Sequence, residues 1–463
     1  MNVLRIHNTL GNQKEVFIPI DEKHIRIYAC GPTVYNYAHI GNARMAVVCD
    51  LLVRFMRQIY PKVTYVSNIT DIDDKIINAS IETNTSIKDL TIKYERIYNT
   101  NMLKLGVLSP DIQPRATEHI KEMINLIEKL INKKNAYISG AHVLFDITSY
   151  KHYGVLSGRN KEDQIAGNRI EVADYKNNAG DFILWKPSSD NQPGWESPWG
   201  RGRPGWHIEC SAMSEKTLKL PFDIHGGGLD LTFPHHENEI AQSCSAHNFK
   251  NPNEYAKYWI HNGFVTMDGE KMSKSLGNIF LVNDLLKLYP GETLRLALLS
   301  THYRQPLNWN PKIIEQAQKI LDRLYRVLKE NDDVILDIKI KPAVEVINAL
   351  SDDINSSQAL FEINAIADKL SKCSQSEKKM LKAKLVASGK ILGILQESPN
   401  SWLKYGATAN NIDGNLIEEL IEKRKEARKN KNFSEADNIR VKLNDMGIEI
   451  EDTLGGTTWR SKN

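Results

Sequence analysis

Two short strings in the sequence carry side chains that can act on a triphosphate. Residues 39–42 read His-Ile-Gly-Asn and open a helical pattern, which a strand-like stretch at residues 24–29 precedes, with Cys-Gly-Pro at 30–32 as the break. Free N–H groups and the dipole at the start of such a helix attract phosphate. Residues 271–275 read Lys-Met-Ser-Lys-Ser, so two ammonium groups in one polar loop can neutralise developing charge. Either string alone fits a helix cap or a solvated loop, but together they predict an ATP site.

Four side chains of the metal-binding type lie in three separate segments. Cys30 follows the first predicted strand, Cys210 lies on a predicted helix, and His235 and Glu239 are four residues apart on another. Residues at this spacing project from one helix face. Two thiols, one imidazole and one carboxylate suit Zn²⁺. The spacing alone leaves ordinary core cysteines and a polar helix start open as alternatives, and Cys244 is a rival ligand.

Alternating strand and helix patterns must position these residues. Predicted strands lie at residues 25–29, 63–69 and 222–225, and predicted helices at residues 41–59, 119–132 and 206–218. This alternation is typical of a Rossmann-type α/β fold with a parallel sheet. A strand pair is expected at residues 136–147 with Gly140 at its turn, a glycine turn at residues 226–228, and a helix beginning near Pro234.

Four parts are expected along the chain. They are a Rossmann-type catalytic domain at residues 1–265 with an insertion at about 120–205, the lysine-loop region at 266–315, a helical bundle at 316–405, and a small carboxyl-terminal domain at 411–463. Residues 150–205 are rich in Gly, Pro, Trp and Asn and are expected to be irregular. The last domain is expected to contain a basic helix at 421–431, a second helix at 434–445 and a strand at 448–451.

The composition is that of an ordinary globular protein. The chain has 463 residues, 41% hydrophobic and 25% charged, and this length predicts several domains. A net charge of +3 permits a nucleic-acid partner without requiring one. No apolar run approaches membrane-spanning length, and the first residues lack a signal-peptide or transit-peptide pattern, so no membrane partner is expected. Five cysteines in so long a chain do not form a disulfide framework, which favours a reducing cytoplasm.

Longer strings extend these motifs over nearly the whole chain. They are Tyr-Ala-Cys-Gly-Pro-Thr-Val-Tyr at 28–35, Asn-Ile-Thr-Asp-Ile-Asp-Asp-Lys at 68–75, Gly-Arg-Pro-Gly-Trp-His-Ile-Glu-Cys at 202–210, Asp-Ile-His-Gly-Gly-Gly at 223–228, Phe-Pro-His-His-Glu-Asn-Glu at 233–239, residues 270–278, and Gly-Thr-Thr-Trp-Arg at 456–460. Together they closely resemble the cysteinyl-tRNA synthetases, a family of class I aminoacyl-tRNA synthetases.

The resemblance implies a two-step reaction and its cofactors. Members of this family activate L-cysteine with ATP to cysteinyl-adenylate and transfer it to the 3′-terminal ribose of tRNA(Cys). The resemblance further implies a monomer, Mg²⁺ accompanying ATP, and one Zn²⁺ that takes the substrate thiol as a further ligand. Its protein ligands would be Cys30, Cys210, His235 and Glu239. A serine hydroxyl cannot match a soft thiolate on zinc, whereas an apolar pocket separates near-isosteres poorly.

The resemblance also assigns residues to substrate binding. Gly31, Thr70 and Trp206 would line the cysteine pocket, although a turn glycine, a strand-end hydroxyl and a core aromatic are their ordinary alternatives. The backbone of three glycines would approach adenosine closely, with Asp230 hydrogen-bonding nearby. These glycines are Gly226, Gly227 and Gly228.

One position departs from the family signature. That signature often reads His-Ile-Gly-His, whereas residue 42 is Asn here. An amide can donate a neutral hydrogen bond to a ribose or phosphate oxygen but cannot carry charge. The electrostatic part of catalysis is then expected from His39 and the two loop lysines. The expected ATP-binding residues of the two strings are His39, Gly41, Asn42, Lys271, Ser273 and Lys274, of which His39, Asn42, Lys271 and Lys274 are the expected catalytic residues.

The carboxyl-terminal unit is the candidate for anticodon contact. Basic residues cluster on its first predicted helix, and an aromatic residue near the end could stack on exposed bases. A solvated helix face with interleaved acids is the ordinary alternative. The candidate tRNA contacts are Lys425, Arg428, Lys429, Trp459 and Arg460.

Two other functions fit parts of the pattern. A ligase that joins activated cysteine to an amino sugar would share the zinc and ATP motifs, but it would not need residues 411–463. A non-catalytic RNA-binding paralogue would be expected to lose His39, the loop lysines or the metal-ligand set, and all of these are present.

Overall fold

The computed structural model resolves the chain into two compact units. The first comprises Met1–Asn283, Thr301–Trp309 and Ile347–Gln358, and the second comprises Asp284–Ser300, Asn310–Val346 and Ala359–Asn463. The residues that the structure describes are 3–158, 174–267, 269–272, 279–403, 414–453 and 456–461. Within these ranges, no helix is long and apolar enough to cross a membrane.

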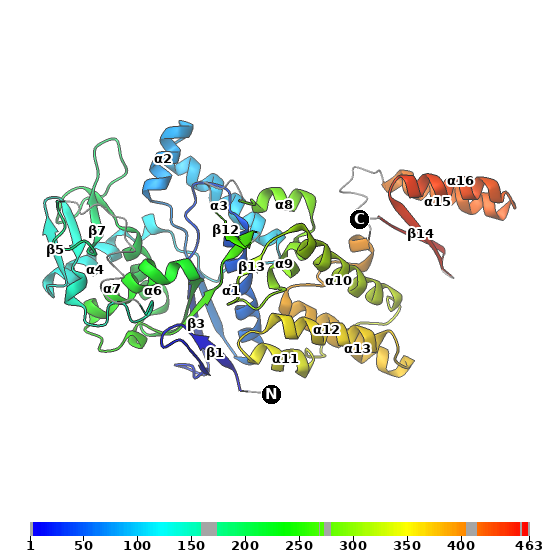
Figure 1. The fold of residues 1–463 in the computed structure, drawn as a ribbon, viewed down its shortest axis with the longest axis horizontal. Coiled ribbons are helices and arrows are strands. Elements are labelled where there is room, and N and C mark those ends of the chain that lie inside the picture. Colours follow the sequence, from blue (N-terminus) through cyan, green and yellow to red (C-terminus); the bar gives the residue numbers. More distant parts are fainter. Residues whose placement is uncertain are drawn as a thin grey trace. The chain divides into compact units, whose positions relative to one another are not determined.

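A four-stranded parallel sheet forms the centre of the first unit (Figure 1). Its strand order is β10-β9-β3-β4, and each neighbouring pair runs in parallel. The strands are β3 (Ile25–Ala29), β4 (Val63–Ser67), β9 (Phe222–Gly228) and β10 (Ala256–Asn262). The predicted Rossmann-type α/β fold is thereby confirmed.

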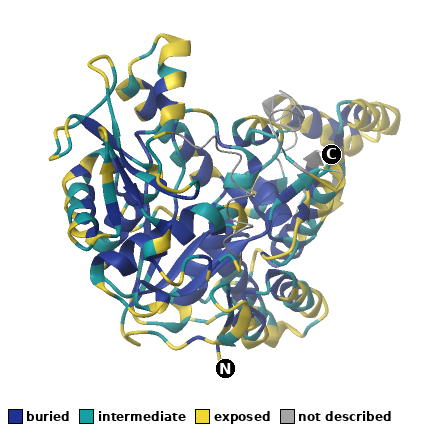
Figure 2. Ribbon diagram, turned by 60° about the vertical axis from the view of Figure 1, so that its left-hand side comes forward, coloured by how far each residue is buried: buried dark blue, intermediate teal, exposed yellow. Residues whose placement is uncertain are grey.

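Helices cross between these strands and cover the sheet. Helix α1 (Ile40–Ile59) joins β3 to β4, α6 (Trp206–Leu218) leads into β9, and α7 (Glu237–His247) leads towards β10. Buried residues concentrate in the strands of the sheet and in the helices beside them (Figure 2). Because parallel strands end at a common edge, Cys30 after β3, Asn68 after β4 and the glycines of β9 lie along one edge.

The expectation of a turn at residues 226–228 is wrong. Gly226, Gly227 and Gly228 belong to β9, where they pair in register with Ile260, His261 and Asn262 of β10. The neighbouring parallel strand supplies the backbone hydrogen bonds that a glycine run does not predict from its own composition. The helix expected near Pro234 is preceded by a π-helical turn at Thr232–His236, so α7 begins at Glu237.

The insertion contains more regular structure than expected. Its four-stranded antiparallel sheet has the order β5-β6-β7-β8. The strands are β5 (Ala136–Ser139), β6 (His142–Phe145), β7 (Phe182–Pro187) and β8 (Gly202–Pro204). The first two and the turn at Gly140, whose φ is 58°, confirm the prediction. Strands β7 and β8 show that residues 150–205 are not irregular throughout.

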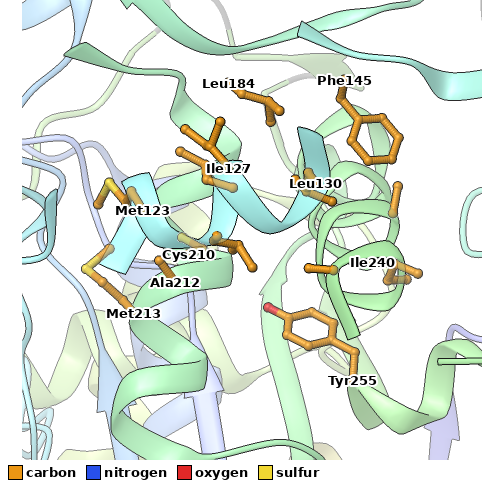
Figure 3. Packing of buried hydrophobic residues seen from close by; sticks show 14 of the residues in the cluster. Met123, Ile127, Leu130, Phe145, Leu184, Cys210, Ala212, Met213, Ile240 and Tyr255 are labelled. Atoms are coloured by element: carbon orange, nitrogen blue, oxygen red, sulfur yellow. The ribbon is translucent and has the colours of Figure 1, made fainter. Parts of the chain in front are cut away.

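One hydrophobic core joins the insertion to the parallel-sheet region. Helix α4 (Ile120–Asn132) buries apolar residues at helical spacing, including Met123, Ile127 and Leu130. These side chains pack in the same cluster as Leu184 of the antiparallel sheet and Cys210 of α6 (Figure 3). Cys210 is therefore held in a helix that the core fixes on one side.

A small sheet carries Lys271, the first residue of the Lys-Met-Ser-Lys-Ser string at residues 271–275, here called the lysine string. Its order is β12-β11-β13, formed by β11 (Val265–Met267), β12 (Glu270–Lys271) and β13 (Leu307–Asn308). The first unit also contains an amino-terminal hairpin of β1 (Arg5–Asn8) and β2 (Gln13–Val16), and helices α2 (Asp74–Thr83) and α3 (Ile87–Lys104).

The second unit is mainly helical. Its longer helices include α9 (Gly291–Leu299), α10 (Pro311–Glu330) and α13 (Gln375–Leu392), while α12 (Ser356–Leu370) begins in the first unit.

The carboxyl-terminal segment has a core of its own. It consists of α15 (Gly414–Lys429), α16 (Phe433–Asp445) and a hairpin of β14 (Ile448–Thr453) with β15 (Gly456–Ser461). Its core contains Ile417, Leu443 and Trp459. The basic helix begins earlier than residue 421, and β15 was not expected.

Candidate active site

The four predicted metal-ligating side chains converge at the edge of the parallel sheet. One ligand atom from each of Cys30, Cys210, His235 and Glu239 lies within 4.8 Å of the others, and all four residues are buried. Cys30 Sγ lies 3.6 Å from both Cys210 Sγ and Glu239 Oε1. His235 Nε2 lies 3.1 Å from the same Glu239 oxygen. The structure therefore brings together residues from three segments that are far apart in sequence.

Two further histidines belong to this cluster, and the sequence analysis did not identify them. Cys30 and Glu239 also form a group of metal-ligand type with His225 and His236. His236 Nε2 lies 3.3 Å from Cys30 Sγ, and its Nδ1 lies 2.7 Å from Nε2 of His261. The adjacent histidines at 235 and 236 were a signal that two imidazoles enter one site.

Hydrogen bonds fix the orientation of the Glu239 carboxylate. Its Oε2 lies 2.9 Å from His225 Nε2 and accepts a 2.8 Å hydrogen bond from the Tyr255 hydroxyl. Its Oε1 faces His235 and Cys30. Outer hydrogen bonds of this kind orient metal-ligating carboxylates in proteins. A buried cluster of Cys, His and Glu with an oriented carboxylate indicates a metal site.

Burial shifts the titration of the two thiols and of His235 towards their neutral forms. It raises the pKa of the Cys30 thiol well above its usual value, and the neighbouring Cys210 thiol adds to this effect. A hydrogen bond from Cys30 lowers the pKa of Cys210, but burial and the Glu239 charge outweigh it and raise that pKa. Burial lowers the pKa of His235 to about 3. A neutral imidazole can ligate a metal ion, and a bound cation would favour the thiolates.

The three residues of the predicted cysteine pocket lie beside this cluster. The Trp206 ring, 39% exposed, stacks on His235 with a centroid distance of 4.3 Å and an interplanar angle of 26°. The buried Thr70 hydroxyl donates a 2.9 Å hydrogen bond to Glu209 Oε2. Burial raises the pKa of Glu209 well above its usual value. Trp206 is thus a wall next to a candidate metal ligand rather than a core aromatic.

Gly31 is required for a close approach of two backbone segments. A β-carbon there would lie 1.6 Å from the carbonyl oxygen of Asn68, so no side chain fits. Gly31 N–H donates a 2.9 Å hydrogen bond to the Asn68 side-chain oxygen. The segment that follows β3 is therefore held against the segment that follows β4.

A cavity of about 310 Å³ opens beside Trp206. Residues of the insertion and of the parallel-sheet region line it together. Asp74 of α2 connects the two regions, because it forms ion pairs with two residues of the insertion, Lys186 at 2.6 Å and Arg203 at 2.9 Å. The candidate pocket thus has an open side that the insertion borders.

His39 and Asn42 form a reciprocal cap at the start of α1. His39 Nδ1 accepts hydrogen bonds from Gly41 N–H at 3.1 Å and Asn42 N–H at 3.3 Å. The Asn42 side-chain oxygen accepts a 3.1 Å hydrogen bond from His39 N–H. A side chain on Gly41 would press on the His39 imidazole, which lies 3.0 Å from the β-carbon position. The helix-cap alternative for His39 therefore describes this structure, and Asn42 has a structural role that its sequence position did not reveal.

The backbone at residues 280–282, after the second signature string, pairs with the backbone beside His39. Ile40 N–H donates to Phe280 O and Val282 N–H donates to Ala38 O, both at 2.9 Å. Lys271 lies in β12, but its side chain, Ser273 and Lys274 lie outside what the structure describes. The segment after residues 271–275 is thus held against the start of α1.

The three glycines at the end of β9 lie close to His236, Asp230 and Cys49. A β-carbon on Gly227 would lie 2.7 Å from His236 Cε1, and one on Gly228 would lie 2.5 Å from Asp230 Oδ1. Gly226 approaches Cys49, with 3.5 Å between its β-carbon position and Sγ. Asp230 itself is exposed. This edge of the sheet therefore presents backbone rather than side chains.

Two of the candidate tRNA contacts on α15 are paired with acids. Arg428 Nη1 lies 2.6 Å from Asp452, Lys425 Nζ lies 3.0 Å from Glu422, and Lys429 is exposed. Hydrogen bonds from Arg424 lower the pKa of Asp452 far below its usual value.

The expectation that Trp459 exposes its ring for base stacking is wrong for this structure. Trp459 is 8% exposed, and its Nε1 donates a 2.9 Å hydrogen bond to Glu418. It pairs with Ile450 across the hairpin and packs in the small core. The Arg460 side chain lies outside the described residues.

Known protein families match most of the chain. Residues 16–319 match the catalytic domain described as tRNA synthetases class I (C), and residues 416–460 match the cysteinyl-tRNA ligase anticodon binding domain. A cysteine–tRNA ligase of Parvibaculum lavamentivorans is 52% identical over 463 residues, covering 99% of this chain and 97% of that protein. One of Rhodospirillum rubrum is 50% identical and covers 99% of both chains.

Solved structures of other synthetases share the fold. Mycobacterium tuberculosis methionyl-tRNA synthetase in complex with methionyl-adenylate is 15% identical, with a TM-score of 0.57 over 82% of this chain and 93% of that one. The LeuRS chain of an Agrobacterium radiobacter complex with tRNA and LeuAMS is 12% identical, with a TM-score of 0.58 over 83% and 87%. These distant likenesses concern the fold, whereas the family matches and close relatives identify the chain. The chain belongs to the class I cysteine–tRNA ligase family.

Proposed function

We propose that this chain activates L-cysteine with ATP and transfers it to the 3′-terminal ribose of tRNA(Cys). The observation that carries the proposal is the convergence of Cys30, Cys210, His235 and Glu239 beside Trp206. A generic carboxylate-activating enzyme has no need for such a set. A thiol-containing substrate would explain this ligand set, because a metal ion held there can bind the thiol. The family membership and the buried sulfur donors therefore both favour cysteine.

The donor set fits Zn²⁺. Two sulfurs, one imidazole and one carboxylate oxygen within 4.8 Å of one another suit a tetrahedral ion. When bound, Zn²⁺ supplies a soft acceptor that distinguishes the thiolate of cysteine from the hydroxyl of serine. His225 and Tyr255 hold the Glu239 carboxylate, and Trp206 closes one side of the site. Gly31 and Thr70 complete the proposed cysteine pocket.

We place ATP along the start of α1 and the end of β9. The backbone of Gly226, Gly227 and Gly228 borders the adenosine, with Asp230 as a hydrogen-bonding partner. His39, Gly41 and Asn42 lie near the phosphates, to which Mg²⁺ is bound. Lys271, Ser273 and Lys274 complete the phosphate contacts. The cysteine carboxylate attacks the α-phosphate in line, which forms cysteinyl-adenylate and releases pyrophosphate. These groups position the carboxylate and stabilise the charge that develops.

The second step requires tRNA, whose anticodon we assign to the carboxyl-terminal segment. The match of residues 416–460 to an anticodon binding domain supports this assignment. Lys425, Arg428, Lys429 and Arg460 are the proposed contacts, with Trp459 as the core residue that supports the hairpin. We further propose that the chain acts as a monomer in a reducing cytoplasm, where the thiols of the site remain unoxidised.

Cysteine-dependent exchange of pyrophosphate into ATP tests the proposal. The purified chain is expected to exchange with cysteine and not with serine at the same concentration. Aminoacylation of tRNA(Cys) then tests the second step against an amino-sugar acceptor. Absence of cysteine-dependent exchange, or transfer to the amino sugar instead of tRNA, would refute the proposed function.

A further inference from the structure

Arg44 is a fully buried cation inside α1 whose hydrogen bonds reach backbone carbonyls. Its Nη1 donates to Gly263 O at 3.0 Å and to Phe264 O at 2.8 Å. Its Nη2 donates to Gln305 O at 2.6 Å and to His302 O at 3.4 Å. Burial lowers the pKa of Arg44 to about 10, which still leaves it charged at neutral pH. A buried charge is costly to desolvate, so its partners must hold it firmly.

The carbonyls that Arg44 holds lie at the starts of two strands of the small sheet. Gly263 and Phe264 directly precede β11, and Gln305 lies two residues before β13. These strands run in parallel, with Val265 opposite Leu307. One planar guanidinium therefore spans both strand starts and fastens them to α1.

The same small sheet carries the backbone of Lys271. Strand β12 pairs with β11 through Thr266 opposite Lys271. Beyond residues 273–278, which lie outside the described residues, Phe280 O accepts a hydrogen bond from Ile40 N–H of α1. Arg44 thus binds the sheet that contains Lys271, the first residue of the lysine string. The backbone next to His39 binds Phe280, which follows the string.

We infer that Arg44 is a positioning residue for cysteine activation, which sets the spacing between the start of α1 at His39 and the sheet that carries Lys271. The inference rests on the proposed function, because both flanking elements are assigned to ATP. Arg44 touches neither ATP nor cysteine; it acts through the backbone. A lysine at this position keeps the charge but offers a single ammonium, which cannot span both strand starts as the guanidinium fork does.

Arg44→Lys, compared with Arg295→Lys, tests the inference. Arg295 is also fully buried, and its Nε donates 2.6 Å to a backbone carbonyl, that of Leu392 in the second unit. Both variants are expected to lower the unfolding temperature. Arg44→Lys alone is expected to lower kcat of pyrophosphate exchange by about 10- to 100-fold, since small misplacement of reacting groups has effects of this size. Its KM for cysteine and its zinc content are expected to stay at wild-type levels.

Three results would overturn the inference. They are an unchanged kcat in Arg44→Lys, an equal loss of kcat in Arg295→Lys, and a loss in Arg44→Lys that appears only as a higher KM for cysteine. If Arg44→Lys does not fold, Gly263→Ala replaces it, because its β-carbon would lie 2.7 Å from Gln305 O and push the same strand starts apart. An unchanged kcat in Gly263→Ala contradicts the inference as well. A wild-type chain without exchange activity refutes the proposed function itself, whereas an active wild type with unaffected variants refutes only the role of Arg44.

Discussion

Cys30 Sγ lies 3.6 Å from Cys210 Sγ, although 180 positions separate the two residues in the chain. Cys30 follows the carboxyl end of β3, and Cys210 lies in the second turn of α6. The distance is far from the ~2.05 Å of a disulfide. It is close to the ~3.8 Å expected between two sulfurs that each lie ~2.3 Å from one tetrahedral zinc ion. The two thiols are therefore spaced for a shared ion.

Replacing Cys210 with alanine is expected to remove bound zinc and weaken cysteine binding while sparing ATP binding. Elemental analysis of the purified variant measures zinc, and equilibrium binding measures each substrate. Cys244→Ala is the matched control, because Cys244 is also buried and lies on α7 outside the four-residue set. Full zinc in Cys210→Ala, or loss of zinc in Cys244→Ala, would show that the ligand set is wrong.

Asn42 is expected to act through the helix cap and to tolerate an imidazole. Asn42→His should leave the activation rate nearly unchanged, whereas His39→Ala should reduce it. Asn42→Asp keeps the oxygen that accepts from His39 N–H, so the cap and the thermal stability should persist. Its negative charge should raise the KM for ATP. Exchange kinetics and thermal unfolding of the three variants check this, and a loss in Asn42→His equal to that in His39→Ala would contradict it.

The sequence predicted local structure well, but it predicted contacts between residues far apart in the chain poorly. The four-residue spacing of His235 and Glu239 predicted their shared face, because helix geometry is local. The meeting of Cys30 with Cys210 depends on the order of the strands in the sheet, which neither segment encodes alone. Before the structure, the residue types suggested that pairing but left core cysteines open, and the family resemblance implied it.

The errors also have physical reasons. The glycines at 226–228 have no side chains to signal a strand, and pairing with β10 decides their conformation. Strands β7 and β8 lie between Gly-rich and Pro-rich stretches, so their short patterns were hidden. Trp459 resembled an exposed aromatic because its buried neighbours, such as Ile417 and Leu443, come from helices that precede the hairpin.

Lys274 is expected to stabilise the charge that develops on the phosphates during activation. Lys274→Ala should lower the rate of cysteine-dependent exchange by a factor on the order of 10²–10³, as the loss of one preorganised hydrogen-bond donor does in other enzymes. Lys250→Ala, at an exposed position outside the site, is the control for loss of a surface charge. Normal exchange in Lys274→Ala would refute the role proposed for the lysine string.

The ion pairs of Asp74 are expected to make the free energy of unfolding depend on pH in the acidic range. Burial opposes ionisation of Asp74, but hydrogen bonds and charges of Lys186 and Arg203 outweigh it and lower its pKa. A carboxylate with a lowered pKa stabilises the fold above its unfolded pKa of about 3.9, and this contribution is lost as the pH falls further. Because Asp74 is more than half exposed, the contribution is expected to be about 1 kcal/mol or less.

Asp74→Asn tests this dependence in urea unfolding. The stability difference between wild type and variant should be constant from neutral pH down to mildly acidic pH and should shrink below about pH 4. A difference that grows with acid would contradict the assignment of the lowered pKa.

Removal of residues 411–463 is expected to separate the two steps of the reaction. The segment has its own hydrophobic core and matches an anticodon binding domain, so the catalytic unit should fold without it. Cysteine-dependent exchange should remain close to that of the full chain. Aminoacylation should fall by at least about tenfold in kcat/KM, because each lost nucleic-acid contact is worth ~1–3 kcal/mol.

The intact chain carrying Asp452→Asn provides the graded version of this experiment. Asp452 accepts hydrogen bonds from Arg424, Arg428 and Thr457, and so connects α15 to the hairpin that carries Arg460. Loosening this tie should weaken aminoacylation less than truncation does and should leave exchange unchanged. If truncation reduced both steps equally, the segment would be a structural support for the catalytic unit, and the anticodon assignment would have to be abandoned.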